Sequence, residues 1–395
     1  MDSKYYVLIN YSKIRIHPKN STQDGACQYR KRVYTHRKPS CRCSAVSQTR
    51  HYLFSSPVVL RSYICYNFQL PENVDSFSRL PVENLLPNSI QSDRIMDDTS
   101  NALLFDARNF YYIGNFMSCI NTVLPEQTTG TPDLLAYSYY SYLAIESARL
   151  INSEIKENNP TALVAFRYLY EYLENPEKRE EITQFFINKL QGDLGDTNIW
   201  LMTGAIVFCR EELYENALKV LQGNDDLECM ALSIYCLLKM NRIDLAKPIL
   251  AKMQEKSDDA TLTQLAQAWI GVLSGGDQLQ DAYHIFQEFC DKYSATPLLL
   301  NGQAVCHIGQ ERHDEAEDVL KESLAKKHND YDTLVNLIVL SHLTGKSAEV
   351  IGRYVEQLKQ FYPNSGFVTD YTKKASEFDR LCLQYQESNK VAPLY

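Results

Sequence analysis

The chain has 395 residues, 45% of them hydrophobic, and a formal net charge of −9, so it is long enough for two or three ordinary domains or for one long solenoid. It has no apolar run near the roughly 18 residues of a transmembrane helix, and no apolar segment before a small-residue cleavage site, so we expect neither a membrane span nor a secretory signal. The cysteines after residue 96 stand singly among apolar residues, as in a reducing cytosol.

Charge divides the chain into two parts. Residues 1–95 carry 14 basic and 6 acidic side chains, whereas residues 96–395 carry 26 basic and 43 acidic ones. Such an asymmetry separates a tail from a fold. The sequence predicts a basic extension of low structure at 1–95 and a folded unit at 96–395. Because Met96 opens a stretch that reads like a new start, the first part is either an accessory extension or a gene-model artefact.

The basic run at residues 30–38 has few apolar neighbours, and three interpretations remain open for it. It is a solvated tail, an Arg-rich transit peptide, or a nucleic-acid or nuclear-import patch. The cysteines at Cys41 and Cys43 lack the paired Cys-x-x-Cys spacing of structural zinc sites, so we do not expect zinc there. Prolines would interrupt any helix in this part: Pro39, Pro57, Pro71, Pro81 and Pro87.

Helical patterns begin at residue 97. The first hairpin spans 97–123 and breaks at Gly114-Asn115, and a long helix is expected over 133–155. Asn175-Pro176 then separates a helix over 161–174 from another over 180–190. Further hairpins are predicted at 196–221 and 227–253, and repeats continue over 258–363. A last helix, 367–384, would cover the exposed end of the stack.

Small residues recur inside the second helix of these hairpins. Ala282 and Ala316 lie 34 positions apart, and another 34 positions lead to Val350. Ala217 and Ala246 take the same place in the earlier hairpins. A small residue is needed there because two antiparallel helices cross closely. A period of 34 residues is typical of tetratricopeptide repeats, so the predicted fold is all-α, a tetratricopeptide-like solenoid.

We find no catalytic constellation. Thr344-Gly345-Lys346-Ser347 looks like the end of a phosphate loop, but the earlier glycine is missing and the segment follows a helix, so we interpret it as a turn. The histidines at His307 and His313 do not share a helix face at metal-ligand spacing. We therefore expect no enzyme activity, no cofactor and no metal.

Several segments resemble one family, the epsilon subunit of coatomer. They include residues 104–114, 225–231, 260–269, 279–288, 298–307, 334–341 and 378–381. The resemblance covers about 97–386, is strong from 225 onward, and is absent over 1–95.

This resemblance implies a non-catalytic coat-scaffold subunit of the COPI coat. Such a subunit binds the C-terminal region of the coatomer alpha subunit and, through it, the rest of coatomer. It acts in retrograde Golgi-to-ER and intra-Golgi transport, in the cytoplasm and peripherally on Golgi membrane and COPI-coated vesicles, without nucleic acid. The alternative is a generic tetratricopeptide adaptor such as a chaperone cofactor.

The repeat register predicts which residues line the concave surface. In tetratricopeptide stacks the second, fifth, ninth and twelfth positions of each first helix point inward. This set is largely apolar and contains no Lys or Arg, so it lacks the basic clamp that holds a terminal carboxylate. The alternative is that these residues pack on neighbouring helices. The predicted partner-binding residues are Ile199, Met202, Ile206, Tyr235, Leu238, Gln267, Leu298, Asn301, Val305, Ile308, Val335 and Val339.

Overall fold

The computed structural model describes residues 98–123, 132–145, 161–190 and 198–390, and every regular element within these ranges is a helix. The all-α fold class is therefore confirmed. The basic extension at 1–95 lies outside the described residues, so its domain assignment stays a prediction.

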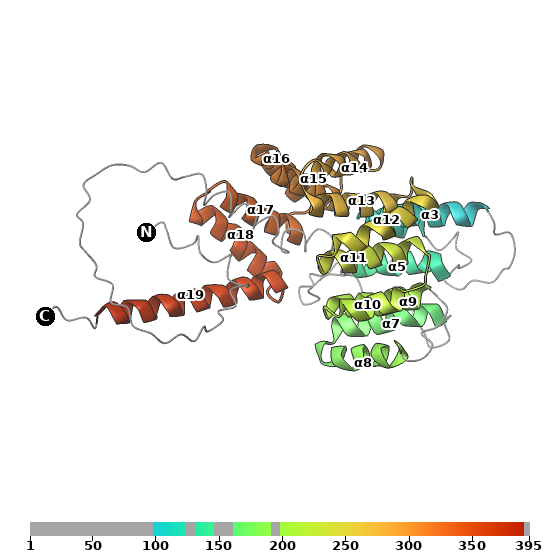
Figure 1. Ribbon diagram of the computed structural model, residues 1–395, viewed down its shortest axis with the longest axis horizontal. Coiled ribbons are helices and arrows are strands. Elements are labelled where there is room, and N and C mark those ends of the chain that lie inside the picture. Colours follow the sequence, from blue (N-terminus) through green and yellow to red (C-terminus); the bar gives the residue numbers. More distant parts are fainter. Residues whose placement is uncertain (1–97, 124–131, 146–160, 191–197, 391–395) are drawn as a thin grey trace, which may run out of the picture. The chain divides into compact units, whose positions relative to one another are not determined.

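The first helices form the N-terminal half of the folded unit (Figure 1). The predicted break at Gly114-Asn115 separates α3 from α4, and Asn175-Pro176 leads into a short 3-10 helix, η1. The helix predicted over 133–155 is described only to Ala144, and residues 146–160 lie outside the described ranges. The bounds are α3 Asp98–Tyr112, α4 Phe116–Thr122, α5 Pro132–Ala144, α7 Thr161–Glu174, η1 Pro176–Lys178 and α8 Arg179–Leu190.

The remaining helices follow the predicted hairpins closely. They are α9 Asn198–Arg210, α10 Tyr214–Leu221, α11 Leu227–Lys239, α12 Ile243–Ser257, α13 Thr261–Ser274, α14 Gln278–Lys292, α15 Pro297–Gly309, α16 His313–Lys326, α17 Tyr331–Leu343 and α18 Ala348–Phe361. None of the helices that the structure describes is both long and apolar enough to cross a bilayer.

One turn recurs between the helices of these hairpins. Its penultimate residue has a positive φ, and the next backbone N–H donates to the carbonyl five positions earlier, as in a Schellman cap. The residues with positive φ are Gly114, Glu212, Asn241, Glu311 and Gly345. The closing bonds, 2.8–2.9 Å long, are Asn115 to Phe110, Leu213 to Phe208, Arg242 to Leu237, Arg312 to His307 and Lys346 to Ser341. The apparent phosphate-loop motif at 344–347 is therefore a turn of this kind.

The small residues lie where two helices cross. Ala217, Ala246, Ala282 and Ala316 are fully or almost fully buried. A Cβ built on Gly271 of α13 would meet the Ala282 Cβ at 3.3 Å, so the backbones of α13 and α14 approach closely there. Val350 of α18 is only half-buried, so the period continues into the last hairpin with a looser crossing.

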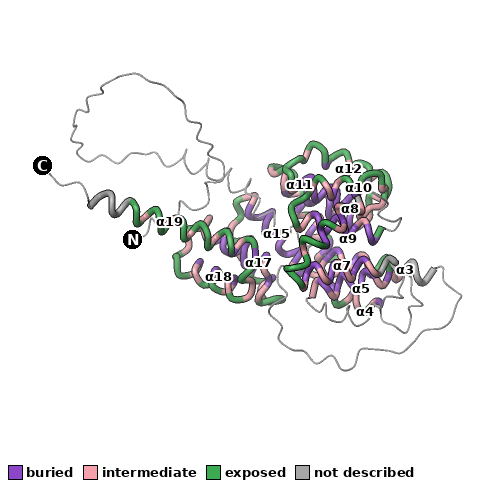
Figure 2. Tube along the Cα trace, turned by 90° about the horizontal axis from the view of Figure 1, so that it is seen from below, coloured by how far each residue is buried: buried purple, intermediate pink, exposed green. Residues whose placement is uncertain are grey.

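Six helices of the early hairpins form a closed circuit of contacts. Along the chain α3 contacts α5, α5 contacts α7, and α7 contacts α9; α9 contacts α11, α11 contacts α13, and α13 returns to α3. We call these helices the closed ring. Its two sides are α3–α5–α7 and α9–α11–α13, and much of the chain in α5, α7 and α9 is coloured as buried in Figure 2. The repeat pattern alone predicted an open solenoid and did not indicate this closure.

Within the described residues, a large and a small cluster of buried apolar side chains belong to the hydrophobic core. The large cluster runs from Ala107 to Cys306 and includes the fully buried Trp269 and Phe166. The small one joins α15, α16 and α17 around Leu320. Burying one such side chain contributes roughly 1.5–3 kcal/mol.

The helix α19, Gly366–Lys390, extends the predicted C-terminal element at both ends. Contacts divide the chain into two units, with residues 57–368 in one and 369–395, hence most of α19, in the other. Tyr371, Ala375, Phe378 and Cys382 form a half-buried stripe at helical spacing along it. Whether α19 covers the end of the stack stays a prediction.

Candidate partner-binding surface

Nearly all the predicted partner-binding residues are buried within this chain. Val339 is half-buried against the large core cluster, and Gln267 is exposed, with its side-chain oxygen accepting a hydrogen bond from Gln254 of α12. The buried ones are Ile199, Met202, Ile206, Tyr235, Leu238, Leu298, Asn301, Val305, Ile308 and Val335. In this conformation they serve as packing residues, and their contact with a partner stays a prediction.

The predicted partner-binding residues of α9 and α11 are buried because these two helices belong to the closed ring. The inner residues of α9 and α11 are buried, because α7 packs on α9 and side chains of α3 and α5 reach α11. Glu228 has the inward register position of α11, and it accepts a hydrogen bond from the Tyr137 hydroxyl of α5. Its Oε1 also lies 3.3 Å from Nε of Arg108 on α3. Glu228, which the register places inward, therefore contacts the chain's own first helices.

The contacts among Arg108, Tyr112, Tyr137 and Glu228, which we call the seam cluster, place charge between the two sides of the ring. Arg108 Nε donates to the Tyr137 hydroxyl over 3.2 Å, and the Tyr112 hydroxyl lies 3.5 Å from it. Burial raises the pKa of Glu228, which the positive charge of Arg108 opposes. Burial also raises the pKa of Tyr137 well above its ordinary value. Desolvation of the Glu228 carboxylate costs energy that its attraction to the half-exposed Arg108 only partly offsets.

The first hairpin closes the ring through polar contacts to distant helices. The Thr261 hydroxyl donates to Asn109 Oδ1 over 2.8 Å, and the Thr296 hydroxyl donates to the Ile113 carbonyl over 2.5 Å. A Cβ added to Gly114 would meet the Leu298 Cβ at 3.2 Å. Leu298, a predicted partner-binding residue, lies against the turn between α3 and α4 in this conformation.

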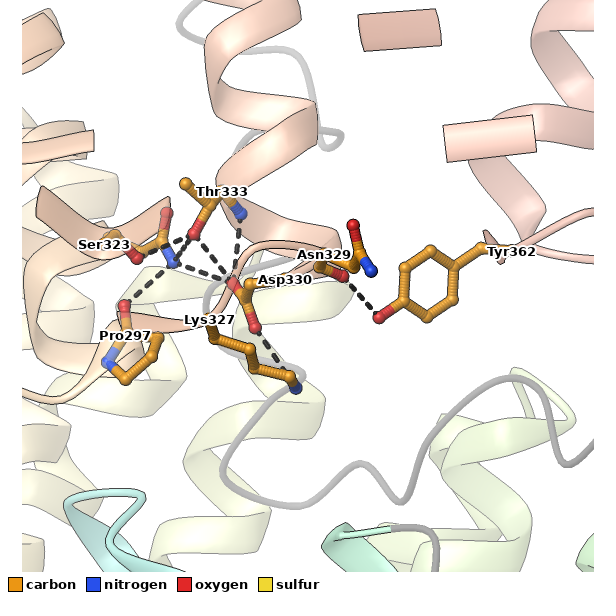
Figure 3. A network of polar contacts seen from close by, with 8 residues as sticks. Pro297, Ser323, Lys327, Asn329, Asp330, Thr333 and Tyr362 are labelled. Carbon is orange, nitrogen blue, oxygen red and sulfur yellow. Dashed lines mark hydrogen bonds and ion pairs between the residues drawn. The ribbon is translucent and has the colours of Figure 1, made fainter. Parts of the chain in front are cut away.

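Asn301 belongs to a second buried polar network, centred on Asp330 (Figure 3). Asp330, only 1% exposed, caps α17 by accepting from the backbone N–H of Thr333, and it also accepts from the Thr333 hydroxyl and from Asn301 Nδ2. Lys327 Nζ lies 3.4 Å from its other oxygen. Asn336 Nδ2 donates to Asn301 Oδ1 over 2.9 Å. The amide of Asn301 is thus used to join α15 to α17.

Exposed apolar side chains gather at places that the repeat register did not single out. Leu213 and Met240 flank the turns after α9 and α11, and Leu245 lies in the first turn of α12. Phe105 and Met117 are 62% and 57% exposed on the first hairpin. Single exposed apolar residues are common on protein surfaces. The signal in the sequence was a leucine or methionine beside a turn whose other residues are polar.

The described residues offer surfaces rather than reactive groups. They contain no group of three or more His, Cys, Asp or Glu side chains that could hold a metal ion. Burial raises the pKa of Cys119 to about 11 and the pKa of Cys306 to about 12, which disfavours the reactive thiolate. His307 and His342 are separately placed, and burial lowers the pKa of each.

These features define a helical-repeat protein of the tetratricopeptide class, in which stacked hairpins present surfaces for contact. The family model of the coatomer epsilon subunit matches residues 100–386. The chain belongs to the coatomer epsilon subunit family. It is 37% identical to coatomer subunit epsilon-2 of Oryza sativa subsp. japonica, over 71% of this chain and 96% of that one, and 34% identical to coatomer subunit epsilon of Dictyostelium discoideum, over 71% and 97%.

Among solved structures, a tetratricopeptide repeat protein from Parabacteroides merdae matches with a TM-score of 0.46 and 11% identity, over 69% of this chain and 97% of that one. The family resemblance predicted from the sequence over about 97–386 is confirmed.

Proposed function

We propose that this chain is a non-catalytic scaffold subunit of the COPI coat that binds the C-terminal region of the coatomer alpha subunit. Through that subunit it joins the rest of coatomer, in the cytoplasm and peripherally on Golgi membrane and COPI-coated vesicles, in retrograde Golgi-to-ER and intra-Golgi transport. The observation that carries the proposal is the family match over residues 100–386. A scaffold built of stacked helical hairpins, with buried thiols of raised pKa, is consistent with it.

We further propose that the inner surface of the repeats, where the predicted partner-binding residues lie, is the surface that binds the alpha subunit. In the closed conformation α7 packs on α9, and side chains of α3 and α5 contact Glu228 of α11. Binding there would require the two sides of the ring to part. The seam cluster favours such a step, because its charged groups regain hydration on opening, whereas a purely apolar interface would not. Val339 is the predicted residue that is apolar and only half-buried before any such step.

Copurification from cells tests the function. Full-length tagged chain should recover the large coatomer subunits. Recovery of heat-shock chaperones in place of coatomer would replace the proposal with the adaptor alternative.

A pair of variants tests the surface. Val339→Asp should weaken binding to a C-terminal fragment of the alpha subunit, whereas Leu213→Asp, on the exposed turn edge, should not. Circular dichroism and Tm establish that both remain folded. If Leu213→Asp loses binding and Val339→Asp keeps it, the partner binds the turn edge and the inner-surface proposal is wrong.

A further inference from the structure

A pair of thiols lies between two successive inner helices. Cys209 is in the last turn of α9, and Cys236 is one turn before the end of α11. Their sulfur atoms are 3.3 Å apart. Both cysteines are free, Cys236 is fully buried, and Cys209 is half-buried, so a small reagent can reach one member of the pair from outside.

The distance suits a covalent bond between the two sulfurs. A disulfide needs about 2.05 Å, so the sulfur atoms must approach by only about 1.2 Å, a movement within the reach of small side-chain torsions. The two helices are already in contact, so neither has to be displaced to bring the thiols together. Lys239, one turn after Cys236 on the same helix, has a positive charge that acts on Cys209.

We propose that Cys209 and Cys236 form a redox-responsive dithiol that closes to an intramolecular disulfide when it reacts with a small-molecule disulfide. The more exposed Cys209 loses its proton and attacks one sulfur of the small disulfide, releasing one thiolate and forming a mixed disulfide. Cys236 then loses its proton and attacks Sγ of Cys209, releasing the second small thiolate. The protein loses two electrons and two protons, and the small disulfide is reduced to two thiols.

The reaction has a characteristic pH dependence. The hydrogen bond with Cys236 and burial raise the pKa of Cys209, and Lys239 opposes this shift. The thiolate is the attacking species, so below this pKa the rate should increase about tenfold for each pH unit. The resulting bond would connect α9 to α11 in the closed ring, closing a covalent loop and raising Tm by restricting the unfolded chain.

The test uses the full-length reduced chain treated with oxidised glutathione under native conditions, then trapped with iodoacetamide. We expect the disulfide to remove two hydrogen atoms and to leave two fewer thiols for iodoacetamide than in the reduced chain, a non-reduced peptide that joins residues 209 and 236, and a higher Tm that reductant reverses. Cys290→Ser is the matched control, because Cys290 is also half-buried but lies on α14; it should leave the joined peptide unchanged.

Two further variants separate the steps. Cys236→Ser should stop the reaction at glutathione bound to Cys209, and Cys209→Ser should leave Cys236 largely unmodified. The proposal is overturned if the folded wild-type chain accumulates only the mixed disulfide, or if the joined peptide forms only after the chain is denatured. Because intact mass and peptide mapping require no coatomer partner, failure here leaves the proposed function untouched.

Discussion

The closed ring and the hairpins from α15 to α18 share one building unit but differ in how far apart in the chain their contacts lie. In the ring, Thr261 bonds to Asn109 across 152 positions and Tyr137 bonds to Glu228 across 91. In the later hairpins, Asn301 reaches Asp330 across 29 positions. Repeat stacks are usually stabilised between neighbours. The contacts among α16, α17 and α18 follow that rule, whereas the ring and the start of α15 bond across much longer separations, so a change in the ring should affect helices far away in sequence.

The largest loss of stability should come from a change in the polar network centred on Asp330. Asp330→Ala removes a buried carboxylate that accepts bonds from Thr333 and Asn301. We expect a loss of roughly 3 kcal/mol in the free energy of unfolding, the upper end for hydrogen bonds to a charged group. Urea unfolding measures it, with Asp330→Asn as the control that keeps the shape and part of the bonding. A cost below about 1 kcal/mol would show that the network does not hold α17 in place.

Substituting Glu228 in the seam cluster should cost less stability, and that cost should depend on pH. Glu228→Ala leaves the Tyr137 hydroxyl and Arg108 without their shared acceptor and should cost about 1–3 kcal/mol. Glu228→Gln should cost less, since it keeps an acceptor of the same shape.

The sign of the pH effect follows from burial, which raises the pKa of Glu228 above its ordinary 4.5. The folded state favours the protonated form of Glu228. The contribution of Glu228 to the free energy of unfolding is therefore complete below a pH of about 4.5 and is lost as the pH rises through the pKa of the folded state. Unfolding experiments from acid to neutral pH should show this loss in the wild type and not in Glu228→Gln. An identical pH profile for the two proteins would contradict the assignment.

Comparing alanine variants of two glycines measures the contact between the first hairpin and Leu298, which helps to close the ring. Gly114 and Gly345 both have positive φ, at +81° and +68°. An added Cβ at Gly114 would press on Leu298, whereas Gly345 has open space around it. Both alanine variants should lose about 1 kcal/mol from backbone strain, and Gly114→Ala should lose more. Equal losses, measured by thermal unfolding, would mean that the first hairpin yields to Leu298 at no cost.

The smallest effect is expected at Lys327, the exposed partner of Asp330. Its side chain is half-exposed and its nitrogen lies 3.4 Å from the carboxylate. Lys327→Ala should cost about 0–1 kcal/mol, because solvent screens the ion pair. Comparing this value with that of Asp330→Ala, by the same urea titration, separates the buried carboxylate from its surface cation. A larger cost than for Asp330→Ala would reverse that assignment.

Local features of the fold were predictable from the sequence. The small residues at Ala282 and Ala316 identified the helix crossings, and Gly114 and Gly345 identified turns. These features depend on residues close together in the chain, where helix propensity, turn chemistry and the repeat period all act. Glu228, which the register places inward on α11, accepts a hydrogen bond from Tyr137 of α5.

The closure of the ring could not be predicted in the same way. It depends on pairings such as Asn109 with Thr261, for which no local pattern exists. Gln267, which the register places inward on α13, is exposed and bonded to Gln254. The small residues on either side of it, Ala246 and Ala282, are 36 positions apart instead of 34, and each extra residue turns a helical position by about 100°. A repeat alignment alone therefore does not determine which side of α13 faces inward.

The bond from Thr296 to Ile113 spans 183 positions, and it has a consequence for how the protein is made. During synthesis the first hairpin leaves the ribosome long before α13 and α15 exist, so the ring cannot close until the chain has grown past residue 296. At a synthesis rate of about 5–20 residues per second, the faces of α3 and α4 that later contact α13 and α15 stay exposed for on the order of ten seconds. Folding of the ring should therefore be slow and sensitive to translation speed, whereas α15 to α18 can assemble as each hairpin appears.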